Sequence, residues 1–383
     1  MKTALRNSLQ SRKSRQSRKS RLLCLAVLLL VAESGLSTTL LFDDFTGSTL
    51  DESTWYLPQG AGTFFGRTQI KPPSFGGQNL RPVVAGGSVT LQLDTHNASA
   101  LVAGDSFWGH EIRTQQTFSA GNGISIEARM RYLGTPPGGI VGALFSYAAG
   151  GGPNPDEVDF ELLSNDLGSA RILTNLYDSE NPSPSGDVAH LTVPGLDLTA
   201  WNTYEIRWLP DRVQWLINGI QIRERLGAVP NDPSEVRLNL WVPGSSFGIA
   251  YDGALQPAAT AAANETYQLE IDYVHVETVP DADGDGVPDS SDNCTLVANN
   301  TGAGAQCDSD GDGFGNRCDG DLNNNGATNA QDISMYRLQL GQPSVGPTYN
   351  QADLNCNGAV NAQDTTMFRQ LLGQPSGPSG LVP

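Results

Sequence analysis

The chain has 383 residues, and its 41 acidic residues outnumber its 23 Lys and Arg residues, so the formal net charge is −18. Phosphates repel such an acidic chain, which argues against nucleic acid as a partner. The length suits two domains, or one large domain with appendages.

Residues 1–34 are predicted to be a signal peptide. Eight Lys and Arg residues precede an apolar run from Leu22 to Ala32, which is too short to span a bilayer comfortably and suits the core of a secretory signal. The long basic stretch leaves an uncleaved anchor as the alternative. If the leader is cleaved, we expect a secreted, extracellular protein, free or attached to a cell surface, with no membrane segment in its mature form.

Residues 35–279 are predicted to form one all-β domain. Short segments alternate apolar and polar residues, as in "SVTLQLDT", "GISIEARMRYL", "TYEIRWL" and "YQLEIDYVHVE", and clusters of Gly, Pro and Asn separate them. This period of two, with turn signals and no helical pattern, indicates a β-sandwich or jelly roll. The pair Asn218-Gly219 in "VQWLINGIQI" predicts a tight hairpin turn.

The segment "DEVDFELLSN", residues 156–165, places three carboxylates on one strand face, because Glu157, Asp159 and Glu161 alternate with apolar residues. One interpretation is an ordinary solvated strand face. The other is catalytic: crowded like charges raise at least one pKa, and glycoside hydrolysis needs a proton donor beside an ionised carboxylate. The outer Cα atoms lie about 13 Å apart on a strand, so the two glutamates would lean together over a bound sugar.

Around this strand, seven segments in order resemble glycoside hydrolase family 16, and within it the lichenase type of bacterial β-glucanase. They are "GHEIRT", "ALFSYA", "TNLYDSE", "TYEIRWLPDRVQWLINGIQI", "LNLWVPG", "FGIAYDGA" and "LEIDYVHVE". The family signature Glu-apolar-Asp-apolar-Glu is matched by "EVDFE" without an extra residue. The resemblance implies a concanavalin A-like jelly-roll sandwich.

The resemblance also implies the roles of the site residues. Glu157 would be the nucleophile, Glu161 the general acid/base, and Asp159 the partner that hydrogen-bonds Glu157. The residues expected to bind substrate are Glu111, Arg113, Phe145, Tyr147, Asn175, Tyr177, Asn239, Trp241 and Phe247. For each aromatic residue the alternative is a place in the sandwich core. The chain departs from the family pattern at Pro155, where lichenases carry Trp, and at Phe247, where another Trp is expected.

After Pro280 the composition changes to Asp, Asn and Gly, and one 12-residue template occurs four times. Each copy has Asp or Asn at positions 1, 3, 5 and 9, Gly at position 6 and Asp at position 12, which suits the oxygen ligands and sharp turn of a calcium loop. The alternative is a disordered acidic linker. The predicted ligands of structural calcium are Asp281, Asp283, Asp285, Asp289, Asp292, Asp308, Asp310, Asp312, Asn316, Asp319, Asp321, Asn323, Asn325, Asn329, Asp332, Asp353, Asn355, Asn357, Asn361 and Asp364. We expect no cofactor for catalysis.

Residues 321–373 contain the last two loops, each followed by a segment of helical pattern. The apolar face of these helices is predicted to include Met335, Leu338, Met367 and Leu371. This duplicated unit resembles a type I dockerin, which implies a calcium-folded module that binds a cohesin on a scaffold or surface protein. The pairs at 330–331 and 362–363 fall where dockerins carry recognition residues.

Residues 280–320 resemble thrombospondin type 3 calcium repeats and are predicted to be a spacer. An even number of cysteines follows the sandwich in this exported chain, which predicts two disulfides with three alternative connectivities. The four residues are Cys294, Cys307, Cys318 and Cys356. Residues 374–383 are predicted to be a flexible tail.

The two resemblances together imply a secreted, retaining endo-β-glucanase that hydrolyses β-1,3-1,4-glucan and is attached through its dockerin to a cohesin. One alternative keeps the mechanism and changes the polysaccharide to β-1,3-glucan, xyloglucan or a galactan. The other is a carbohydrate-binding module without catalytic activity.

Overall fold

The structure is a computed structural model that describes residues 37–59, 64–99, 106–148, 155–180, 186–227, 229–300, 304–345 and 349–382. The predicted signal peptide lies outside the described residues. Among the helices of the described segments, none combines the length and the apolar character that a membrane span requires.

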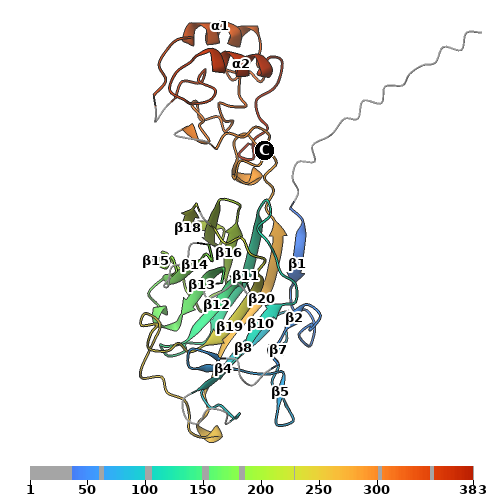
Figure 1. The fold of residues 1–383 in the computed structure, drawn as a ribbon, viewed down its shortest axis with the longest axis vertical. Coiled ribbons are helices and arrows are strands. Elements are labelled where there is room, and N and C mark those ends of the chain that lie inside the picture. Colours follow the sequence, from blue (N-terminus) through green and yellow to red (C-terminus); the bar gives the residue numbers. More distant parts are fainter. Residues whose placement is uncertain are drawn as a thin grey trace, which may run out of the picture. The chain divides into compact units, whose positions relative to one another are not determined.

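The larger of two stacked sheets contains 11 strands in the described part of the chain (Figure 1). They are β1 (Thr39–Asp43), β3 (Phe64–Phe65), β4 (Thr68–Ile70), β7 (Val83–Val84), β8 (Val89–Asp94), β9 (Phe107–Gly109), β11 (Ile124–Leu133), β16 (Asn202–Trp208), β17 (Arg212–Ile217), β18 (Ile220–Leu226) and β20 (Thr266–Thr278). The order is β18-β17-β16-β11-β20-β8-β9-β4-β3, and β1 and β7 pair with β20 and β8. Each pair is antiparallel except β4 with β9.

The smaller sheet contains seven strands within the described segments, and these carry the predicted catalytic residues. They are β2 (Trp55–Tyr56), β10 (Glu111–Thr114), β12 (Val141–Tyr147), β13 (Glu157–Leu163), β14 (Arg171–Tyr177), β15 (Ala189–Thr192) and β19 (Glu235–Trp241). The order is β15-β14-β13-β12-β19-β10-β2. A short hairpin pairs β5 (Ser74–Phe75) with β6 (Gln78–Asn79), and 3-10 turns occupy Ser164–Asp166, Ala261–Ala263 and Asp289–Ser291.

The alternating segments fold as predicted, and the all-β sandwich is confirmed. In β8 every second side chain is buried, and these side chains join one large core between the sheets. The predicted hairpin connects β17 and β18. Both Asn218 (φ 52°) and Gly219 (φ 75°) adopt the left-handed conformation that the tight primed turn requires.

Two hydrogen bonds from the larger sheet fix the backbone of β13. The Tyr132 hydroxyl donates to the carbonyl of Leu162 at 2.6 Å and accepts from the N–H of Gly142 at 2.9 Å. Trp215 Nε1 donates to the carbonyl of Asp159 at 3.0 Å. Tyr132 and Trp215 are buried, so these bonds are shielded from water and hold the carboxylate strand against the opposite layer.

The C-terminal region contains two helices, α1 (Ala330–Gln339) and α2 (Ala362–Leu371). Each begins with a capping box, formed by Asn329 in α1 and by Asn361 in α2. The rings of Tyr336 and Phe368 stack with centroids 4.5 Å apart, which places the two helices side by side (Figure 1).

The predicted apolar face of these helices is wrong in one half. Met335 and Leu338 are 37% and 77% exposed, whereas Met367 and Leu371 pack against the small core. The reason is that Tyr336 takes the inward position of α1. The buried residues of this core are Leu322, Tyr336, Ala352, Leu354, Val360 and Phe368.

The cysteines form the pairs Cys294–Cys318 and Cys307–Cys356, which selects one of the three connectivities. The second disulfide links the spacer to the last calcium-type loop.

The tail differs from the flexible segment that its composition predicts. The carbonyl of Pro378 accepts from Thr295 N, while Gly377 N and Gly380 N donate to the carbonyls of Cys318 and Asp292. Backbone hydrogen bonds to the spacer therefore hold residues of this segment, which a Pro/Gly/Ser composition does not reveal.

Candidate active site

The carboxylates of β13 lie in a grid of side chains on the outer face of the smaller sheet. Glu157 lies between Tyr147 on β12 and Tyr177 on β14. Asp159 lies between Phe145 and Asn175 on the same two strands. The intervening Val158 and Phe160 point into the core and are fully buried.

The row of side chains that begins at Glu161 crosses β12 and continues onto β19 and β10. Ala143 separates Glu161 from Asn239 on β19, and Glu111 on β10 is the next cross-strand neighbour. Glu111 accepts hydrogen bonds from Arg113 and, at 3.3 Å, from Asn239 Nδ2. Asn239 Oδ1 is buried and has no hydrogen-bond partner among the described residues, so it can accept from a ligand hydroxyl.

Aromatic side chains border this grid. The Trp241 and Phe247 rings stack with centroids 6.2 Å apart, and Phe65 lies on Trp241 at 6.3 Å. Tyr147, Tyr177, Trp241 and Phe247 are partly exposed, whereas Phe145 is only 3% exposed. The first four can cover the apolar face of a sugar ring, while Phe145 packs beneath the site.

Burial of the carboxylates perturbs their titration. Burial raises the pKa of Glu161 to about 8, and the Glu157 carboxylate adds to that effect. Burial also raises the pKa of Glu157 to about 7, against a hydrogen bond from Asp159 and the positive charge of Arg237, which both lower it. The pKa of Asp159 is raised well above its usual value by burial and then by the charges of Glu157 and Glu161.

These directions give the three groups different states near neutral pH. Burial and the neighbouring charges favour the protonated form of Asp159, which shares a hydrogen bond with Glu157. Glu157 ionises before Glu161, because their pKa values are about 7 and about 8. A proton donor and an ionisable carboxylate on the same strand face are the two groups that glycoside hydrolysis requires.

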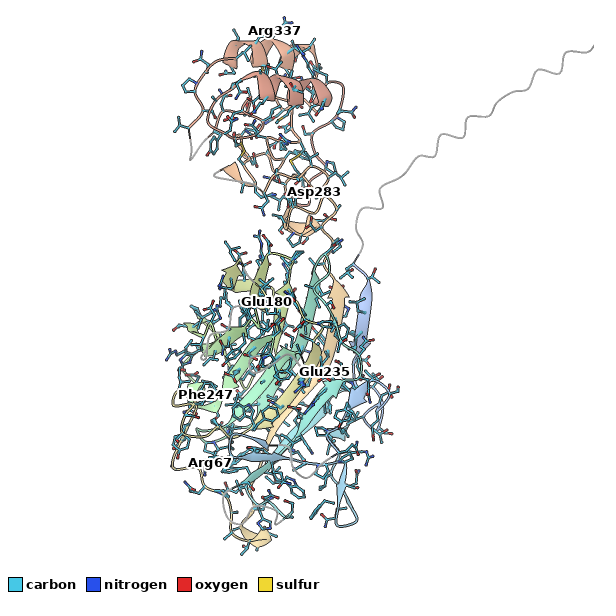
Figure 2. The ribbon with its side chains drawn as sticks, viewed as in Figure 1. Arg67, Glu180, Glu235, Phe247, Asp283 and Arg337 are labelled. Carbon is cyan, nitrogen blue, oxygen red and sulfur yellow. A yellow bond between two sulfur atoms is a disulfide. The ribbon has the colours of Figure 1, made fainter. Side chains whose placement is uncertain are left out.

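Two charged residues of the grid were missed from the sequence. Arg237 is 4% exposed, and its Nη2 lies 2.7 Å from Glu235 Oε2. Its guanidinium lies 4.1 Å from the centroid of the Tyr147 ring. Glu235 is labelled in Figure 2 on the smaller sheet. The period of two in "EVRLNLW" could have revealed both, because they alternate in phase with Asn239 and Trp241.

The acidic loops of the spacer gather carboxylates that fit a hard cation. In the first loop Asp281, Asp283 and Asp285 bring carboxylate oxygens within 4.8 Å of one another, and Asp308, Asp310 and Asp312 do so in the second. Figure 2 labels Asp283 in the first of these loops.

Two observations in the first loop fit a bound cation. Oδ2 of Asp283 and Oδ2 of Asp292 are buried without a hydrogen-bond partner among the described residues. Burial and then the Asp285 charge raise the pKa of Asp283 to about 6. A bound calcium ion would satisfy these oxygens and remove the repulsion.

Several predicted ligands contact protein atoms in the structure. At position 9, Asn329 and Asn361 cap helices, Asp289 accepts from Ala282 N, and Asn316 bonds Ser309 N and two carbonyls. At position 1, carboxylate oxygens of Asp281, Asp308, Asp321 and Asp353 accept from the N–H of the Gly at position 6. These bonds shape the four loops.

Amides replace carboxylates in the two loops of residues 321–373. Asn323 Nδ2 donates to Asp332 Oδ1 at 2.7 Å, and Asn355 and Asn357 both donate to Gln363 Oε1. Asn325 Nδ2 donates to Gln331 Oε1, whereas Asn325 Oδ1 accepts from Asn329 Nδ2. Burial raises the pKa of Asp364, and the Asp353 charge also raises it. In each loop, hydrogen bonds therefore join predicted ligand positions to one another.

The stacked sheets and the paired titrating glutamates between aromatic walls define a glycoside hydrolase of the β-sandwich class. Residues 76–275 match the model of glycosyl hydrolases family 16, more than half of the chain, and the protein belongs to this family. Residues 319–373 match the dockerin type I domain, so the chain also carries a dockerin.

Curated relatives of the chain are named as β-glucanases. A Beta-glucanase of Acetivibrio thermocellus is 26% identical over 208 residues, covering 53% of this chain and 53% of the relative. A Beta-glucanase of Bacillus subtilis (strain 168) is 28% identical over 133 residues, covering 34% of this chain and 50% of the relative. The chain thus spans about half the length of these relatives.

Among solved structures, the endo-beta-1,3-glucanase from Pyrococcus furiosus superposes with a TM-score of 0.50 at 18% identity. The match covers 63% of this chain and 94% of that chain. At this identity the similarity supports the sandwich fold.

Proposed function

We propose that the protein is a retaining endo-β-glucanase that hydrolyses β-1,3-1,4-glucan. The observation that carries the proposal is the row of Glu157, Asp159 and Glu161 on one sheet face, where burial raises all three pKa values. The relatives named Beta-glucanase support a glucan as the substrate.

In the first step Glu161 donates its proton to the glycosidic oxygen as the bond to the anomeric carbon breaks. The Glu157 carboxylate attacks that carbon and forms a glycosyl ester. Asp159, whose protonated form is favoured by burial, stabilises the charge of Glu157 through their hydrogen bond. In the second step Glu161 removes a proton from water, the water oxygen attacks the same carbon, and the ester bond to Glu157 breaks.

The substrate would lie across the strands of the smaller sheet. Asn239 Oδ1 and the Glu111–Arg113 pair offer hydrogen-bonding groups to sugar hydroxyls, together with Asn175. The partly exposed aromatic rings would cover pyranose faces. This combination of apolar walls and few polar groups is typical of sugar sites.

A second candidate substrate is xyloglucan. A relative named Xyloglucan endotransglucosylase/hydrolase protein 3, from Arabidopsis thaliana, is 27% identical over 201 residues. The site also lacks a Trp at Pro155. A binding module without catalysis is less well supported, because it would not need two buried glutamates in one row.

A polysaccharide panel tests the proposal. The wild-type chain, Glu157→Gln and Glu127→Gln are incubated with barley β-glucan, laminarin, xyloglucan and agarose, and new reducing ends are measured. Glu127 is the matched control, because it lies on β11 of the other sheet. We expect wild type and Glu127→Gln to cleave barley β-glucan and Glu157→Gln to be inactive. An inactive wild type, or an active Glu157→Gln, would overturn the proposal.

The C-terminal region is proposed to attach the enzyme. Residues 280–320 would be a calcium-bound spacer and residues 321–373 a calcium-folded dockerin that binds a cohesin, after cleavage of a signal peptide at residues 1–34 and secretion. Ala330, Gln331, Ala362 and Gln363 are exposed at the starts of α1 and α2, which fits recognition by a partner. Retention on immobilised type I cohesins with calcium, and release by chelator, is the expected result. Failure to bind any cohesin of a broad panel would refute the attachment role.

A further inference from the structure

We propose that Arg237 is a positioning residue of this site, which orients Tyr147 and keeps the Glu157 nucleophile ionised. This inference rests on the proposed function of the grid. It concerns a residue that does not belong to the predicted catalytic or sugar-binding set.

Arg237 is a buried cation with one ion-pair partner among the described residues. Its Nε and Nη2 donate to Glu235 Oε2 at 2.9 and 2.7 Å. The side chain of Arg237 is 4% exposed, whereas that of Glu235 is 22% exposed. Taking a guanidinium out of water costs free energy even when it is paired, so stability alone does not explain an arginine in this position.

A second arginine increases this cost. Arg113 on β10 is the direct cross-strand neighbour of Arg237. Burial lowers the pKa of Arg237, and the Arg113 charge also lowers it. Like charges opposite each other destabilise a sheet. The arrangement therefore keeps positive charge in the grid at the expense of stability.

Tyr147 connects this charge to the nucleophile. It is the cross-strand neighbour of Glu157 on one side and of Glu235 on the other. The guanidinium lies over its ring at 4.1 Å, a distance that gives a cation–π contact. Because Glu235 fixes the guanidinium, the plane of the Tyr147 ring is fixed beside Glu157.

The groups that face Glu157 come from its own strand and from four others. They are Asp159 on its own strand, Tyr147 on β12, Tyr177 on β14, Glu235 and Arg237 on β19, and Glu111 on β10. Arg237 favours the carboxylate form of Glu157, and Glu111 opposes it. Removing the arginine would leave the nucleophile among acids and aromatic rings.

The test compares pH profiles of kcat/KM on soluble β-glucan. Arg237→Met removes the charge and keeps the length of the side chain, and Arg237→Lys keeps the charge without the planar group. Arg129→Met is the matched control, because Arg129 pairs with Asp272 at 2.6 Å and lies 5.0 Å from the Trp201 ring, on the other sheet.

We expect Arg237→Met to move the acidic limb to higher pH by about 0.5 to 1 unit, so that kcat/KM below the limb falls about three- to tenfold. Arg237→Lys should return the acidic limb to its wild-type pH, because the positive charge is kept. Its KM should stay above the wild-type value, because lysine has no planar group to support the Tyr147 ring. Arg129→Met should match wild type. An unmoved acidic limb in an active Arg237→Met, or the same shift in Arg129→Met, would overturn the inference.

A second variant keeps the test decisive if Arg237→Met does not fold. Glu235→Gln leaves the arginine without its counter-charge, so the acidic limb should move to lower pH. A limb that does not move, or that moves to higher pH, would contradict the proposed effect on Glu157. A wild-type protein that is inactive on every glucan would instead overturn the proposed function. Failure of the inference about Arg237 can therefore be distinguished from failure of the proposed function.

Discussion

Replacement of the proton donor should stabilise the folded enzyme at alkaline pH. In Glu161→Gln a neutral amide of the same shape replaces a carboxyl whose pKa is raised to about 8 by burial and by the Glu157 charge. Wild type must either hold a charge in this buried position above that pH or unfold. The variant avoids this cost and loses activity.

The sign and the size of the change in the free energy of unfolding follow from proton linkage. Because the folded-state pKa is raised above the unfolded value, the stabilising contribution of Glu161 is fully present below about pH 4.5 and is lost as pH rises through about 8. The gap between 4.5 and about 8 corresponds to at most about 5 kcal/mol. Local relaxation and water entry reduce the expected gain at pH 9 to about 2–4 kcal/mol.

The assay is urea unfolding followed by tryptophan fluorescence at about pH 4.5 and about pH 9, in saturating calcium. The difference between Glu161→Gln and wild type should be small at the lower pH and favour the variant at the higher pH. Glu52→Gln, at an exposed glutamate, is the control and should show no such change. A variant-minus-wild-type difference that is equal at both pH values would refute the argument.

Three further predictions test other parts of the structure. The pH profile of kcat/KM should be bell-shaped, with an acidic limb near pH 7 from Glu157 and an alkaline limb near pH 8 from Glu161. A flat profile across this pH range would contradict the assignment of the two glutamates. Tyr132→Phe removes the hydrogen bonds to the carbonyl of Leu162 and from the N–H of Gly142, so urea unfolding should show a loss of about 1–3 kcal/mol, and a loss below about 0.5 kcal/mol would be inconsistent. Chelation should make the C-terminal region sensitive to protease while the sandwich persists, because six buried residues form its small core; unchanged digestion would argue against calcium-dependent folding.

The period of two explains why much of the fold and site could be predicted. It gave the sandwich strands, and it placed Glu157 and Glu161 on the face opposite Phe160. The tight turn followed from local chemistry, since Asn218 and Gly219 tolerate positive φ. These signals depend on residues close together in the chain.

Long-range packing explains what was missed. Arg237 lies on β19, far from Glu157 in the sequence. It contacts the Tyr147 ring, and Tyr147 is the cross-strand neighbour of Glu157. Tyr132 and Trp215 contact β13 across the core, and no spacing in the chain predicts such bonds. The sequence alone does not distinguish a buried arginine from an exposed one, because burial depends on neighbours that are distant in the chain.

The C-terminal region shows the same limit. Loop spacing indicated the calcium-type repeats, but it could not choose among three cysteine pairings. Helical periodicity placed Leu338 inside, whereas the ring stacking of Tyr336 with Phe368 sets the rotation of α1 and leaves Leu338 exposed. Hydrogen bonds to the spacer order the tail, which has no local pattern of its own.

The assignment of Glu157 and Glu161 to different roles is the central claim, and azide rescue with an activated aryl β-glucan oligosaccharide tests it most directly. In Glu157→Ala, azide should replace the missing nucleophile and give the α-glycosyl azide. In Glu161→Ala, the Glu157 ester forms first, and azide should open it to the β-glycosyl azide. The anomeric coupling in the proton NMR spectrum distinguishes the products, and the reverse pattern, or no azide product from either variant, would contradict the account.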